Sequence, residues 1–238
     1  MKLAFVSDIH GNAIASLAVL KDIKQRNVDK IYVLGDLCYR GPEPQRSLDL
    51  VRSMDVDVIK GNADEWVVRG IKEGEVPEGV RSMMNNERDW TVSKLTDDNI
   101  NYLKNLPTEL NLAFDNVDIH AFHATPTSLF DVVPSDASDE ILTEEIMVSD
   151  ADIFIYGHIH KPYVRFIDGK CIINTGSVGL PFDGSNKASY TIVEIEENNI
   201  GASIIRVSYD VNKVIKQFKE SDYPNKELMI NILNNASV

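Results

Sequence analysis

Cysteine is scarce in this sequence, which has only two cysteines among 238 residues. Cys38 and Cys171 lie far apart, so neither a disulfide framework nor a zinc site made of thiolates is expected. No apolar run approaches the ~18 residues that a membrane-spanning helix requires. The apolar stretch at the N-terminus is too short for a signal peptide. These features predict a cytoplasmic protein with reduced thiols and no membrane partner.

Basic residues are also few, because 24 Lys and Arg stand against 37 Asp and Glu and give a formal net charge of −13. Duplex nucleic acid is not an expected partner, since binding it needs clusters of Lys and Arg to neutralise phosphates. Hydrophobic residues make up 43% and charged residues 26% of the chain, which is typical of a globular protein. A chain of this length can form a core without a disulfide or structural metal.

Short β-rich runs alternate with helical patterns in the first half of the chain. Strands are predicted at 2–7, 30–34 and 56–60, with one helix capped by Asn12 and another opening at Pro44. This alternation predicts βαβ units with parallel strands, and therefore an α/β fold. Further strands are predicted in the second half, at 116–122, 152–156, 171–174, 189–196 and 200–207.

The region of about 65–110 is instead mostly helical and polar. We interpret it as a helical, cap-like excursion from a single domain over 1–238, and we expect it to influence the choice of substrate. Helices are predicted again at about 210–235, where the apolar residues recur at helical spacing. Their apolar faces are expected to pack on the domain, and a contact between subunits of an oligomer remains an alternative.

Polar side chains follow five of the apolar runs at the point where each run ends. Four of the five histidines fall at such ends, where open α/β sheets place their ligand crevice. Imidazole, carboxylate and amide groups without thiolate suit manganese, iron, zinc or nickel. Alternation along an extended segment would place His158 and His160 on the same side. The residues at these ends are Asp8, His10, Asp36, Asn62, His123, His158 and His160.

The spacing of these residues resembles that of the calcineurin-like metallophosphoesterases, in particular their small prokaryotic phosphodiesterase branch. The motifs that carry the resemblance are Asp8-x-His10, Gly35-Asp36-(x)3-Arg40-Gly41, Gly61-Asn62, His123, Gly157-His158-x-His160 and the segment 174–179. The resemblance implies a four-layer αββα sandwich, in which two mixed β-sheets are flanked by helices. It also implies a dinuclear metal centre at one edge of the sheets.

The resemblance implies roles for individual residues as well. One of two divalent metal ions would be held by Asp8, His10 and His160, and the other by Asn62, His123 and His158. Asp36 would bridge both ions, and Asp36, Asn62 and His10 are the candidate catalytic residues. Manganese is the expected metal, with iron, zinc and nickel as alternatives.

Two further residues are candidates for substrate binding. Arg40 could clamp a phosphate oxygen, and its alternative is a surface salt bridge. Asn12 could orient the substrate, although capping a helix would already explain it. His120 is expected to be a structural histidine.

The implied reaction is hydrolysis of a phosphodiester or phosphoanhydride bond in a small nucleotide-like substrate by a metal-bridging hydroxide. The alternatives are an asymmetric dinucleoside-tetraphosphate hydrolase, a phosphoprotein phosphatase and a non-catalytic scaffold of the same fold. Many members of the family have a histidine after the Gly-Asn pair that protonates the leaving oxygen. Here Ala63 occupies that position, so substrates with good leaving groups are expected to be preferred.

Overall fold

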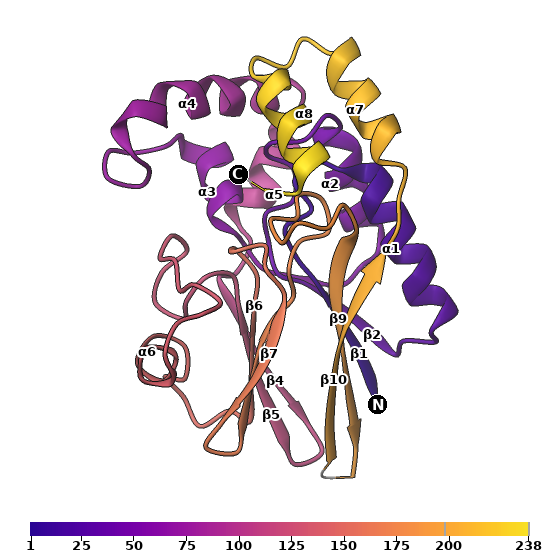
Figure 1. Cartoon of the computed structure of the whole chain (residues 1–238), viewed down its shortest axis with the longest axis vertical. Helices are drawn as coiled ribbons and strands as arrows, with labels where there is room; N and C mark the ends of the chain where they lie inside the picture. The colour runs from indigo at the N-terminus through magenta and orange to yellow at the C-terminus, as the bar shows by residue number, and fades with distance from the viewer. Residues whose placement is uncertain (198, 238) are drawn as a thin grey trace.

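Two five-stranded sheets form the centre of the protein in a computed structural model that describes residues 1–197 and 199–237 (Figure 1). The first sheet has the order β10 (Asn199–Val207), β9 (Ala188–Glu196), β1 (Lys2–Val6), β2 (Lys30–Val33) and β3 (Asp57–Val58). The second has the order β4 (Glu109–Phe114), β5 (Val117–Phe122), β6 (Ile153–Tyr156), β8 (Lys170–Asn174) and β7 (Tyr163–Ile167).

Both sheets are mixed. In the first sheet β1, β2 and β3 are parallel, while β9 pairs antiparallel with both β1 and β10. In the second, β5, β6 and β8 are parallel and the edge strands β4 and β7 are antiparallel. The parallel strands of each sheet therefore end at a common edge.

The two sheets pack face to face through alternate residues of their strands. Leu3 and Phe5 of β1 contact the core between the sheets, which also contains Ile119 and Ile153 of the second sheet. Ala4 of β1 points the other way, into the core beneath the helices that cover the first sheet. This period of two is the one expected for a strand buried on both faces.

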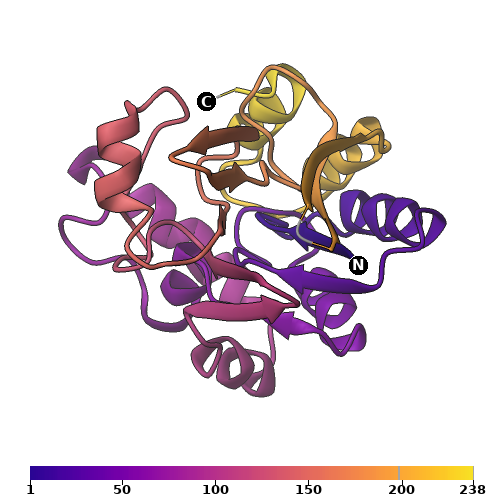
Figure 2. The ribbon, with the colours of Figure 1, turned by 90° about the horizontal axis from the view of Figure 1, so that it is seen from below.

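Helices cover the outer face of each sheet. The first sheet is covered by α1 (Ala13–Gln25) and α2 (Pro44–Ser53), and the second by α6 (Asp139–Glu145) with its flanking loops (Figures 1 and 2). Asn12 caps α1 by accepting a hydrogen bond from the Ala15 amide, and α2 opens on Pro44. The four layers confirm the predicted αββα sandwich.

Five more helices gather at the upper end of the sheets in Figure 1. They are α3 (Asn62–Arg69), α4 (Glu78–Ser93) and α5 (Asp97–Lys104), with α7 (Val211–Glu220) and α8 (Lys226–Asn235) from the C-terminal part. The three helices of the excursion lie within residues 62–104, and β4 begins at Glu109, close to the predicted bound of about 110. Strands β4 and β7 and helix α6 were not predicted. Within the described residues, no helix combines the length and the apolar character needed to cross a bilayer.

Candidate metal centre

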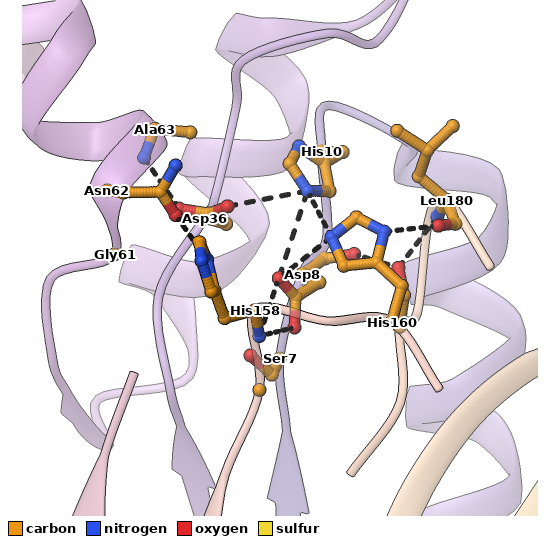
Figure 3. A network of polar contacts seen from close by, with 12 residues as sticks. Ser7, Asp8, His10, Asp36, Gly61, Asn62, Ala63, His158, His160 and Leu180 are labelled. Atoms are coloured by element: carbon orange, nitrogen blue, oxygen red, sulfur yellow. Dashed lines mark hydrogen bonds and ion pairs between the residues drawn. The ribbon is translucent and has the colours of Figure 1, made fainter. Parts of the chain in front are cut away.

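The seven polar residues that follow the strands come together in one place, and Figure 3 labels all of them except His123. Asp8 and His10 follow β1 and Asp36 follows β2, while Asn62 is the first residue of α3. The other three come from the second sheet, after β5 and β6, and are His123, His158 and His160. All but the partly buried His158 are buried. The centre therefore lies where the two sheets meet.

Four of these residues form a compact group. Asp8, His10, Asp36 and His160 each offer a ligand atom, and these atoms all lie within 4.8 Å of one another. The Nε2 atoms of His10 and His160 are 3.0 Å apart, and His160 Nε2 lies 3.1 Å from Asp8 Oδ1. Two carboxylates and two imidazoles at these distances could hold one divalent cation.

A second group surrounds the side-chain oxygen of Asn62. This oxygen lies 2.9 Å from His123 Nε2 and 2.9 Å from His158 Nδ1. Asp36 connects the two groups, because its Oδ2 is 3.4 Å from His10 Nε2 and its Oδ1 is 3.5 Å from His123 Nε2. Asp36 therefore has the position that a bridging carboxylate would need.

Backbone carbonyls determine which nitrogen of three imidazoles is free. The Nδ1 atoms of His10 and His123 lie 2.9 Å and 2.7 Å from the carbonyl oxygens of Tyr39 and Leu34, and His160 Nδ1 contacts that of Leu180. A carbonyl can only accept, so each Nδ1 donates its N–H and each neutral ring keeps a lone pair on Nε2. Metal-ligating histidines are commonly fixed in this way.

These lone pairs face other acceptors. The Nε2 lone pairs of His10 and His160 meet at 3.0 Å, and that of His123 meets the Asn62 oxygen at 2.9 Å. Acceptors this close need a shared proton or a shared cation between them. The spacing of these facing atoms therefore fits bound divalent cations.

Burial and charge favour the ligand forms of most of these groups. Burial lowers the pKa of His10 to about 4 and that of His158 to about 4, which keeps both rings neutral. Burial opposes ionisation of Asp8 and Asp36, yet nearby histidines hold the pKa of both carboxyls below the usual range. Burial also opposes the imidazolium of His123, but Asp36 raises its pKa to about 10. A bound cation would supply the positive charge that His123 otherwise provides.

The backbone is left-handed at five of the seven positions. The φ angles are 55° at Asp8, 47° at His10, 56° at Asp36, 67° at His158 and 56° at His160. Such conformations cost about 1–3 kcal/mol each in residues other than glycine, and they concentrate at functional sites. The expectation that the last two histidines lie on one side of an extended segment is therefore wrong. They turn into opposite halves of the centre.

Two glycines allow the backbone to approach the acidic side chains. A Cβ atom at Gly157 would lie 2.5 Å from Asp8 Oδ2, and one at Gly61 would lie 2.6 Å from the Asp36 amide nitrogen. Real Cβ atoms essentially never come so close. Glycine is required at both positions because any side chain would displace a candidate ligand.

Asp64 is a further buried acid beside the centre, and the sequence analysis did not single it out. Its carboxylate accepts hydrogen bonds from the amides of Asp36 and Gly61, at 2.8 Å and 2.9 Å, and of Leu37, at 2.9 Å. Burial and the charge of Asp36 raise the pKa of Asp64 to about 7. The sequence feature that could have identified Asp64 is its place as an acidic residue in the first turn of a helix, two positions after the candidate ligand Asn62. Asp64 thus fixes the loop that carries the Asp36 carboxylate.

The two predicted substrate-binding residues already have partners within the fold. Arg40 Nε donates to Glu87 Oε2 at 3.1 Å. Asn12 caps α1 and donates from Nδ2 to the Gly179 carbonyl at 3.0 Å. Their contact with substrate stays a prediction. His120 has a structural contact, since its Nε2 lies 2.8 Å from Glu109 Oε2.

Comparisons with known proteins show which family and which solved structures the chain resembles. The family model of the calcineurin-like phosphoesterase superfamily domain matches residues 1–198. An uncharacterized protein of Methanocaldococcus jannaschii is 29% identical in an alignment of 240 positions that covers 93% of each chain. The crystal structure of a metallophosphoesterase from Sphaerobacter thermophilus is 26% identical with a TM-score of 0.79, over 99% of both chains. A hypothetical protein from Pyrococcus horikoshii is 20% identical with a TM-score of 0.84, over 99% of this chain and 98% of that one, and shares the fold.

Proposed function

The chain belongs to the calcineurin-like phosphoesterase superfamily, and from this membership we propose that it is a metal-dependent hydrolase of small phosphate esters. The bond that it cleaves is a phosphodiester or phosphoanhydride of a nucleotide-like substrate. The observation that carries the proposal is the 3.0 Å approach of the His10 and His160 lone pairs, both fixed by backbone carbonyls. Two lone pairs that face each other at this distance repel each other without a cation and could both bind one.

Two cations would be held by the two groups of residues. Asp8, His10 and His160 would hold one, the group around the Asn62 oxygen would hold the other, and Asp36 would contact both. When bound, divalent cations supply Lewis acidity, which polarises a phosphoryl oxygen and makes a bound water more acidic. Because Asp8 and Asp36 neutralise only part of that charge, the centre would be cationic within an acidic protein. It would therefore attract a small phosphate while the remaining surface repels polyanions.

The residues of the chain position the reacting groups. Asp36 is fixed by the Ala63 amide, which donates to Asp36 Oδ1 at 2.8 Å, and by the contacts of Asp64 to its loop. During hydrolysis a water oxygen forms a bond to phosphorus, and the bond from phosphorus to the leaving oxygen breaks. Ala63 offers a backbone N–H to Asp36 but no side-chain proton to the leaving oxygen. Good leaving groups, such as aryl oxides and nucleotide phosphates, are therefore expected to react fastest.

The test is hydrolysis of bis(4-nitrophenyl) phosphate with added Mn²⁺. We expect turnover that requires the metal and that falls at least about a hundredfold in Asp36→Asn. Asp115→Asn is the matched control, because Asp115 is an exposed aspartate in the β4–β5 turn. It should leave turnover unchanged.

A panel of phosphodiesters, phosphomonoesters and dinucleoside polyphosphates would define the substrate class. An alkyl phosphodiester should react more slowly than its nitrophenyl analogue, and equal rates would contradict the leaving-group argument. Failure to hydrolyse any ester or anhydride with any of the four metals would instead favour a non-catalytic scaffold.

A further inference from the structure

A cleft of about 330 Å³ opens beside the candidate metal centre. Its walls come from the loop before α6, the loop between β6 and β7, and the loop between β8 and β9. Half of the eight residues that line it are apolar, and the other four are Ser135, Asp136, Lys161 and the candidate ligand His158. The residues that matter here are Val132, Pro134, His158, Ile159, Lys161 and Phe182.

His158 connects the cleft to the centre. Its Nδ1 atom lies 2.9 Å from the Asn62 oxygen, within the second group of candidate ligands. Its Nε2 atom is buried and has no hydrogen-bond partner among the described residues. The same ring lines the cleft. A phosphate bound at the centre would therefore have its organic substituent within reach of the cleft.

Phe182 supplies the aromatic wall of the cleft. Its ring stacks on the His160 ring, with centroids 4.3 Å apart and an angle of 21° between the planes. Its amide also donates to the His160 carbonyl at 3.3 Å. Phe182 is thus held in place by a candidate metal ligand, and it lines the cleft without belonging to the centre.

The loop before α6 contributes exposed apolar residues to the cleft. Val132 leaves 67% of its surface exposed, although a large hydrophobic side chain beside a cleft gains by being covered. Lys161 is exposed and forms no ion pair within the part of the chain that the structure describes. The exposed Asp136 also lines the cleft, so Lys161 is not its only charged residue. Apolar side chains and a lysine beside a candidate phosphate site match a flat ring joined to an anion.

We propose that this cleft binds an aromatic ring attached to the reacting phosphorus, either an aryl group or a nucleobase-bearing one, and that Phe182 is the residue that selects it. The proposal rests on the proposed function, because it takes the phosphate to lie at the metal centre. It goes further by naming the class of organic substituent. A small aliphatic substituent would leave Phe182 and Val132 uncovered and would bind more weakly.

The test compares the binding of phenylphosphonate and methylphosphonate to the Mn²⁺-loaded protein by calorimetry. Both probes carry the same anionic group and neither is hydrolysed, so the comparison isolates the organic substituent. We expect the wild-type protein to bind phenylphosphonate about tenfold more tightly. Phe182→Ala should abolish this preference while it changes the affinity for methylphosphonate by less than about twofold.

Two further variants keep the result interpretable. Phe182→Leu retains an apolar side chain without a ring and should lose most of the preference even if the alanine variant folds poorly. Phe166→Ala removes a 62% exposed phenylalanine that does not line this cleft, and it should keep the full preference. Equal affinities in the wild-type protein, or a preference that survives in both Phe182 variants, would overturn the proposal.

The same preparation is assayed for hydrolysis of bis(4-nitrophenyl) phosphate. Metal-dependent hydrolysis without any preference for phenylphosphonate would overturn the assignment of the cleft and leave the proposed function standing. Loss of both hydrolysis and phosphonate binding would overturn the two together.

Discussion

Glu87 of α4 has a fully buried side chain that joins three parts of the protein. Its Oε2 accepts hydrogen bonds from Arg40 Nε at 3.1 Å and from the Tyr39 hydroxyl at 3.2 Å. Its Oε1 accepts one from Asn225 Nδ2, just before α8, at 3.2 Å. Because the Tyr39 carbonyl orients His10, Glu87 links the helical excursion and the C-terminal helices to the candidate metal centre.

Glu87→Ala should lower the free energy of unfolding by about 3 kcal/mol, because it leaves the Arg40 guanidinium without its partner. Removing one member of a buried ion pair costs about 3–5 kcal/mol. The Arg40 side chain is 17% exposed, so partial hydration places the expected loss at the lower end of that range. Glu87→Gln keeps the shape and part of the hydrogen bonding and should cost about 1–2 kcal/mol.

Urea unfolding followed by circular dichroism measures this loss. Glu78→Ala is the matched control on the same helix, because Glu78 is 71% exposed and pairs with Arg81 at 2.7 Å. An exposed pair contributes about 0–1 kcal/mol, so the control should change stability by no more than that. Equal losses in Glu87→Ala and Glu78→Ala would refute the reasoning.

Three further predictions concern the centre. Gly157→Ala should weaken Mn²⁺ binding at least about tenfold, because the new Cβ would lie 2.5 Å from Asp8 Oδ2. Gly79→Ala is the control, because a Cβ there would meet nothing within 4 Å outside its own helix backbone. Calorimetry measures the Mn²⁺ affinity of both variants. Mn²⁺ at a hundred times its dissociation constant should stabilise the protein by about 2.7 kcal/mol, seen as a higher melting temperature, and Asp36→Asn should lose this shift. Asp64→Asn should lower the free energy of unfolding by about 2–3 kcal/mol in urea, because one amide oxygen replaces a carboxylate that accepts three backbone N–H groups. A stability equal to that of the wild type would contradict the role given to Asp64.

The sequence predicts the central strands well because they are buried runs of Val, Ile and Phe with clear ends, whereas the four-layer sandwich was implied by the family resemblance. The strands that it misses are edge strands. Glu109–Phe114 alternates exposed and partly buried residues and directly follows the helical region, while Tyr163–Ile167 has only one fully buried residue. Both strands are defined by antiparallel pairing with a neighbour, to β5 and to β8, which a local pattern does not reveal.

For the centre, the sequence predicts which side chains gather but not how they are held. His10 and His123 are oriented by the carbonyls of Tyr39 and Leu34, which any residue at those positions could supply. The left-handed turns are also hidden, because aspartate and histidine adopt them more often than most residues but far less readily than glycine. The position of Asp36 between the two groups follows from the fold, since its neighbours come from separate strands.

The centre depends on the packing of the two sheets. The first sheet delivers the carboxylates of Asp8 and Asp36, and the second delivers His123, His158 and His160. The first sheet also delivers His10, but neither sheet alone completes either group of candidate ligands, so each group is complete only once the apolar faces between the sheets are buried. A cation that binds this arrangement and not the unfolded chain stabilises the stacked state by mass action. Metal binding and the stability of the sandwich are therefore linked through the same packing.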